Sequence, residues 1–171
     1  MTYYTLFDFE ICTLALFSDG EKIHNICFNF KDYVPKTNEK LEKNDNLPVF
    51  IETKKWLSEY LSGKNPSLKN LKLSLNGTPF QLAVWEELKT IPYGKTITYG
   101  EISKKVAKKL GKLKLSAQAV GGAVGRNPIP IIIPCHRVVG ANNKLTGFHG
   151  GLDLKRFLLA KEGIDLTKFK N

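Results

Sequence analysis

Long apolar runs are missing from this 171-residue sequence, and their absence argues against a membrane-spanning helix. Such a helix needs about 20 mostly apolar residues, far more than the apolar segment IPIIIP at 129–134 provides. The opening stretch, MTYYTLFDFE, carries acidic residues and no basic cluster, so it does not look like a signal peptide. We therefore expect a cytoplasmic, intracellular protein without membrane contact.

Cysteine is also scarce, with Cys12, Cys27 and Cys135 as the only three. An odd number without the short spacings of metal sites indicates neither a disulfide framework nor a zinc centre. We expect reduced thiols, as is usual inside cells.

Acidic residues become rare in the second half of the chain. Residues 1–76 hold 10 basic and 10 acidic residues, whereas residues 77–171 hold 16 basic and 6 acidic residues, so this half carries the whole net charge of +10. Such an excess is typical of a domain with a polyanionic partner, most simply nucleic acid. The alternative is a lysine-rich solvated surface without a partner.

The first half of the chain predicts a small sheet followed by a helix. Strand-like segments within residues 3–30 flank Asp19-Gly20, which is typical of a hairpin turn. Residues 31–46 are polar and predict a surface loop, and a helix is expected from about Pro48 to Gly63.

The second half predicts helices with clear start signals. Two stretches, Thr78-Pro-Phe-Gln and Thr98-Tyr-Gly-Glu, match capping boxes, and Ser116 is a third N-cap candidate. A further helix is expected over LDLKRFLLAKE, before Gly163. The helices at 98–110 and 116–125 have a helix-turn-helix layout, which many helical domains share.

The helix at 116–125 is built largely from small residues, AQAVGGAVG after the cap. An interior glycine costs about 1 kcal/mol relative to alanine, so something must approach this helix closely. A neighbouring helix and an external partner both satisfy that requirement.

Cys135 and His136 form the most chemically suggestive pair, in IPIIIPCHRVVG. A thiol becomes a strong nucleophile when it loses its proton, and a histidine can accept that proton. In an extended segment neighbouring side chains point to opposite faces, so this pair requires a bent backbone or a bridging water. The alternative is that Cys135 is a small buried apolar residue.

The stretches GTPFQLAVWEELKTIPYGKTITYGEIS, GRNPIPII, PCHRVVG and LTGFHGGLDLKRFLLAKEG resemble O6-alkylguanine-DNA alkyltransferases over residues 76 to 163. The resemblance implies an α+β protein of two domains. Residues 1–75 would form an RNase H-like domain with a small antiparallel sheet and helices. Residues 76–171 would form a mainly helical domain with a winged helix-turn-helix-like motif. The partner would be double-stranded DNA containing O6-alkylguanine, bound by a monomer without a cofactor.

The resemblance also implies roles for individual residues. Cys135 would accept the alkyl group, His136 would act as its base through a water, and Glu162 would orient His136. Asn127 would brace the turn before the active-site loop, and Tyr99 would help flip the nucleotide and protonate the leaving guanine. The helix at 116–125 would enter the minor groove, with candidate DNA contacts at Ala117, Gln118, Ala119, Gly122 and Arg126. The base pocket would be shaped by Pro130, Val138, Phe148, His149 and Gly150.

The chain departs from the family pattern at three places. Gln118 stands where many members carry the arginine that fills the gap left by the flipped base, and His149 replaces a smaller residue. Of the residues that bind a structural zinc in some members, only His24 has a match, so we expect no metal. A related branch without activity carries tryptophan in place of the cysteine, and Cys135 argues against it.

Two other classes of function stay open on the residues alone. A DNA-binding regulator would bind DNA without taking up an alkyl group. A redox-sensing thiol protein would need a second cysteine close to Cys135, and none lies near it in the sequence.

Overall fold

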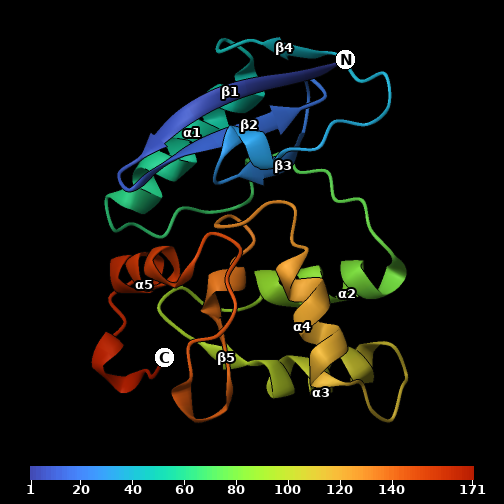
Figure 1. The fold of residues 1–171 in the computed structure, drawn as a ribbon, viewed down its shortest axis with the longest axis vertical. Coiled ribbons are helices and arrows are strands. Elements are labelled where there is room, and N and C mark those ends of the chain that lie inside the picture. Colours follow the sequence, from blue (N-terminus) through green and yellow to red (C-terminus); the bar gives the residue numbers. More distant parts are fainter. The chain divides into compact units, whose positions relative to one another are not determined.

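The computed structural model describes residues 1–171 as two compact units, Met1–Leu75 and Asn76–Asn171 (Figure 1). The first unit is a four-stranded sheet with one α-helix, and the second is mainly helical. The predicted α+β class is therefore confirmed. No helix in either unit has the length and apolar character needed to cross a membrane.

The sheet of the first unit has the strand order β3-β2-β1-β4. Its strands and helix are β1 (Thr2–Phe9), β2 (Cys12–Ser18), β3 (Ile23–Cys27), β4 (Leu41–Lys43) and α1 (Pro48–Leu61), with a 3-10 turn at Phe30–Asp32. The β1–β2 and β2–β3 pairs are antiparallel. Gly20 has a φ of 108° between β2 and β3, which explains the glycine at this turn.

Two expectations for this unit are wrong in detail. The sheet is not purely antiparallel, because β4 pairs with β1 in parallel, Thr2 opposite Leu41. The predicted surface loop at 31–46 contains that strand. The three residues of β4 carry little apolar character, and they form a strand because they pair with the edge of β1. Local sequence does not show that such an edge is available.

The core of the first unit is formed by buried residues of the strands and of α1, and in β2 the burial is continuous from Leu14 to Ser18, so both faces of that strand are covered. Phe9, Leu16 and Phe17 are fully buried in the sheet, as are Phe50 and Leu57 in the helix. In Figure 1 the helix α1 lies along the sheet of its own unit. The helix expected from about Pro48 to Gly63 is confirmed as α1, with Pro48 at its first turn.

The second unit is built from four α-helices, three short 3-10 turns and a two-stranded pairing. Its elements are α2 (Pro79–Lys89), β5 (Ile97–Thr98), α3 (Tyr99–Lys109), α4 (Ala117–Gly125), β6 (Val138–Val139) and α5 (Leu152–Lys161), with 3-10 turns at Cys135–Arg137, Ala141–Asn143 and Leu166–Lys168. Strands β5 and β6 pair in parallel, Ile97 opposite Val138. This pairing joins the start of α3 to the segment that follows Cys135.

The predicted helix starts in this unit are confirmed. Thr78 and Thr98 each accept a hydrogen bond from the backbone N–H three residues later, and the Gln81 and Glu101 side chains return the bond. Ser116 caps α4 through the Ala119 N–H at 3.0 Å. These caps fix where α3 and α4 begin and so define the helix-turn-helix.

Candidate active site and DNA-binding face

Cys135, His136 and Arg137 form a single 3-10 turn, and all three side chains are buried. Of the two arrangements that the sequence left open for this pair, a bent backbone or a bridging water, the structure contains the bent backbone. Pro134 precedes the turn, and the Arg137 N–H donates to the Pro134 carbonyl at 3.1 Å. The backbone therefore bends at the thiol, and the two chemically active side chains need not point to opposite faces.

Glu162 is the centre of the charge network behind Cys135. Its Oε1 lies 2.6 Å from His136 Nε2, and both of its oxygens accept hydrogen bonds from Arg137 Nε and Nη2 at 2.9–3.1 Å. The Gly94 N–H donates to Oε2 at 2.9 Å. Gly94 has a φ of 73°, and an added Cβ would lie 3.2 Å from the Glu162 carbonyl, so glycine suits this approach.

Burial and neighbouring charges shift the pKa values of Cys135, His136 and Glu162, which form a row of three ionisable side chains. Burial raises the pKa of the Cys135 thiol, against smaller lowering by a hydrogen bond from Asn127 and by the charge of Lys155. Burial lowers the pKa of His136, although Glu162 works to raise it. Burial also works to raise the pKa of Glu162, but His136 and Arg137 outweigh it and lower that pKa to about 2. At neutral pH the resting row is therefore a thiol, a neutral imidazole and a carboxylate.

Asn127 links the end of α4 to the active-site loop. Its Nδ2 donates to the Ile133 carbonyl at 2.7 Å, and its Oδ1 accepts from the Ile129 N–H at 3.0 Å. Between them Ile131 has a φ of 74°, which is rare for a β-branched residue and costs about 1–3 kcal/mol. The asparagine therefore holds a strained turn over residues 129–133, which ends two residues before Cys135.

The residues expected to shape the base pocket do not all lie in the same environment. Pro130 and Val138 are buried, Phe148 and Gly150 are partly buried, and His149 is exposed. Tyr99 is partly buried at the start of α3. Burial raises the pKa of its hydroxyl, although a hydrogen bond with Thr146 lowers it, so Tyr99 stays a proton donor at neutral pH.

Most of the small residues of α4 face solvent, although Ala123 is buried. The five candidate DNA contacts are all exposed, namely Ala117, Gln118, Ala119, Gly122 and Arg126. A Cβ added to Gly122 would meet only Arg126 Nη1, at 3.8 Å, and one added to Gly125 would meet nothing within 4 Å. Packing inside this unit therefore does not require these two glycines, and a partner outside the chain is the better explanation.

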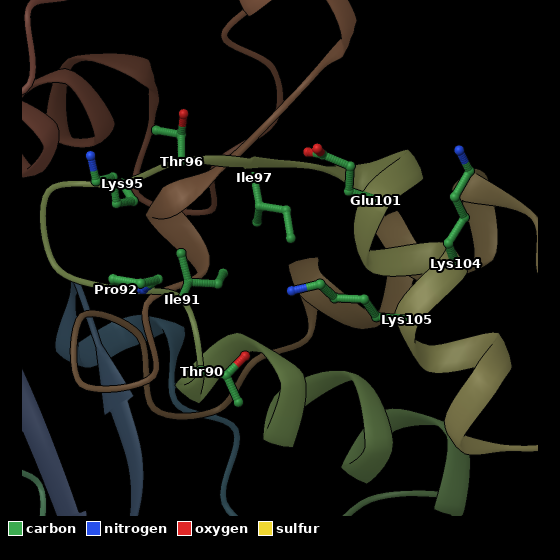
Figure 2. A pocket seen from close by; sticks show the side chains of 9 residues that line it. All are labelled: Thr90, Ile91, Pro92, Lys95, Thr96, Ile97, Glu101, Lys104 and Lys105. Atoms are coloured by element: carbon green, nitrogen blue, oxygen red, sulfur yellow. The ribbon is translucent and has the colours of Figure 1, made fainter.

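A pocket of about 450 Å³ lies to one side of this site, between the 90–97 segment and α3. Figure 2 shows Lys105 pointing into it toward Ile91 and Ile97, while Lys104 points away. None of the predicted site residues lines it, so it is not the alkyl-acceptor pocket.

The sequence did not predict a role for two buried basic residues near Cys135, namely Arg137 and Lys155. Arg137 holds Glu162 and also donates from Nη1 to the Ile91 carbonyl at 2.7 Å. Lys155 occupies the apolar face of α5, four residues before the buried Leu159. A lysine in the apolar stripe of a helix was the available signal for the second residue.

Two family models match the chain and together span almost all of it. The DNA-binding domain of 6-O-methylguanine DNA methyltransferase matches residues 79–164, and the ribonuclease-like domain of the same family matches residues 2–75. The chain belongs to the 6-O-methylguanine DNA methyltransferase family. The predicted family and enzyme class are confirmed.

Several full-length relatives are similar to the chain. The methylated-DNA–protein-cysteine methyltransferase of Haemophilus influenzae is 44% identical over 162 residues, covering 95% of this chain and 87% of the relative. That of Methanosarcina acetivorans is 46% identical over 165 residues, covering 94% and 98%. Among solved structures, Mycobacterium tuberculosis O6-methylguanine methyltransferase has a TM-score of 0.81 at 39% identity, covering 99% and 100%. The M. tuberculosis OGT complex with DNA has a TM-score of 0.79 at 36% identity, covering 98% and 94%.

Proposed function

We propose that this chain repairs double-stranded DNA by taking the alkyl group from O6 of guanine, and less readily from O4 of thymine, onto Cys135. The observation that carries the proposal is the buried row behind the thiol, in which His136 Nε2 lies 2.6 Å from Glu162 Oε1. Family membership supports the same chemistry. All the residues involved come from one unit of one chain, which supports action as a monomer. We place this action inside the cell, where cysteine thiols stay reduced.

The transfer begins with removal of the thiol proton. Since the resting pair is neutral, Cys135 gives its proton to His136 through a water, and Glu162 stabilises the imidazolium. The thiolate attacks the alkyl carbon, the new C–S bond forms as the C–O6 bond breaks, and the electron pair leaves with guanine. Tyr99 donates a proton to that leaving base. The relay thus avoids holding a free thiolate at rest in a buried site.

DNA recognition rests on α4 and on the lysines beside it. The exposed small residues of α4 permit close approach to a minor groove, where sequence information is degenerate. A hollow of about 850 Å³ at the helix-turn-helix is lined by four lysines and no acidic residue, with Lys104, Lys108, Lys112 and Lys114 among its walls. These ammonium groups suit the phosphates of both strands. The alkylated nucleotide must leave the stack to reach the buried Cys135.

One molecule of protein is expected to accept one alkyl group. The product is a thioether, which has no carbonyl for water to attack, so the acceptor is not regenerated. Incubation with excess O6-methylguanine DNA, followed by mass spectrometry, should show one methyl group on the peptide containing Cys135. Repaired guanine formed in excess of protein would contradict the proposal, and DNA binding without methyl uptake would instead favour a regulator.

Gln118→Arg is expected to raise the single-turnover repair rate on duplex DNA, with a smaller gain on single strands. Gln118 is exposed on the predicted DNA face of α4, and its short amide holds the gap left by a flipped base less firmly than arginine would. One added hydrogen bond contributes about 1 kcal/mol, or about a fivefold rate. Asn70→Arg adds the same charge to the other unit and should change neither rate. Equal gains on both substrates would mean that residue 118 does not occupy the gap.

A further inference from the structure

Lys155 is the one fully buried lysine of the chain, with 0% of its surface exposed. Lysine is almost never fully buried without a partner, because removing an ammonium from water is costly. The residue lies in the middle of α5, between the buried Leu154 and Leu158. Such a position needs an explanation beyond packing.

The ammonium of Lys155 joins two segments that surround the thiol. Its Nζ donates to the Val138 carbonyl at 2.5 Å and to the Thr146 carbonyl at 2.9 Å. Val138 begins β6 directly after the Cys135–Arg137 turn, and Thr146 lies two residues before Phe148. Both carbonyls belong to segments predicted to shape the base pocket.

The charges around Lys155 leave it as the available cation for Cys135. Arg137 and His136 already bind the Glu162 carboxylate. The two hydrogen bonds of Lys155 go to uncharged carbonyls. The charge that acts on Lys155 is that of Cys135, which works to raise the pKa of the lysine. Burial is the larger effect and lowers the pKa of Lys155 to about 8, whereas the Lys155 charge works to lower the pKa of Cys135. Other polar groups also interact with this thiol: the Asn127 side chain and the backbone N–H groups of Cys135 and His136 work to lower its pKa, and its charge works to raise the pKa of Tyr99.

We infer that Lys155 is a positioning residue for alkyl transfer, which ties the two walls of the base pocket together and supplies the positive charge that stabilises the forming Cys135 thiolate. This inference rests on the proposed function. The proton still passes to His136, and Lys155 keeps its own protons throughout the step. A neutral side chain of similar length would leave the thiolate buried without a nearby free cation.

Lys155→Met tests the charge directly, because methionine has similar length and no ammonium. Cys135 is alkylated with iodoacetamide over a range of pH without DNA, and the peptide containing Cys135 is followed by mass spectrometry. We expect the midpoint to move to higher pH by about one unit, and hence the rate at neutral pH to fall about tenfold. Lys168→Met removes an exposed lysine of the same unit and should leave the profile unchanged. An unchanged midpoint in folded Lys155→Met would overturn the inference.

Two further measurements keep the inference testable if Lys155→Met does not fold. Lys155→Gln keeps a donor for one carbonyl and removes the charge, so the same upward movement is expected. In the wild type, coupling to Lys155 should make the Cys135 profile broader than a one-proton titration. A one-proton profile, or a glutamine variant with the wild-type midpoint, would count against the role of the charge. Methyl uptake from DNA by the wild type is measured separately, so failure of the proposed function would be distinguishable.

Discussion

Cys135→Ala is expected to abolish alkyl transfer from O6-methylguanine DNA and to leave duplex affinity unchanged. The thiol is 7% exposed behind the surface, whereas the predicted DNA face of α4 is made of other residues that are exposed. Removing one sulfur therefore removes the acceptor without touching the binding face. The measurements are methyl uptake by mass spectrometry and affinity for the same duplex by fluorescence anisotropy.

The matched control is the double variant Cys12→Ala and Cys27→Ala, which should transfer at the wild-type rate. Both thiols lie in the first unit, and burial raises the pKa of each, that of Cys27 to about 11. Burial raises the pKa of Cys135 too, but neither Cys12 nor Cys27 lies in the unit that holds the His136–Glu162 pair, so neither is expected to act as the nucleophile. Methyl groups appearing on Cys12 or Cys27 in Cys135→Ala would show that the acceptor has been wrongly assigned.

Glu162→Gln is expected to reduce the transfer rate by about 10²- to 10⁴-fold, the usual contribution of a proton-transfer network. An amide cannot stabilise the His136 imidazolium as a carboxylate does. Arg137 donates to both oxygens of the carboxylate, from Nε to Oε2 and from Nη2 to Oε1. Glutamine would place an NH₂ group, which is a donor, against one of these two donors. Single-turnover repair at saturating DNA measures this loss, because it separates the chemical step from binding.

The same substitution should also change stability in a pH-dependent way. The pKa of Glu162 is lowered to about 2 in the folded chain, so its contribution is present above the ordinary value of 4.5 and is lost as pH falls toward 2. That difference corresponds to about 3 kcal/mol at neutral pH. We expect Glu162→Gln to lower the free energy of unfolding by about this amount near pH 7 and much less near pH 2. Urea unfolding at several pH values measures it.

Glu86→Gln provides the control for both effects. Glu86 is an exposed residue of α2 that pairs with Lys89 on the surface, where an ion pair contributes about 0–1 kcal/mol. Its replacement should leave both the transfer rate and the pH profile of stability close to those of the wild type. If Glu162→Gln behaved like this control, the carboxylate would have no part in the relay.

The helical frame of the second unit follows from local sequence. Thr78, Thr98 and Ser116 cap their helices through atoms only three residues away, so the pattern is readable without knowing the fold. The family resemblance also rests on short stretches, above all PCHRVVG around Cys135. These features predicted the α+β class, the family and the position of the thiol.

The sequence by itself therefore determined which helices form and which cysteine resembles the acceptor, because caps, turns and motifs act over a few residues. Only the tertiary structure decided how the site is charged. Arg137 meets Glu162 across 25 residues of sequence, and Lys155 reaches the Val138 carbonyl across 17. It also decided that Cys135 lies on a bent turn and that β4 pairs with the edge of the sheet. Burial and long-range contacts set these features, and neither is a property of a short stretch of chain.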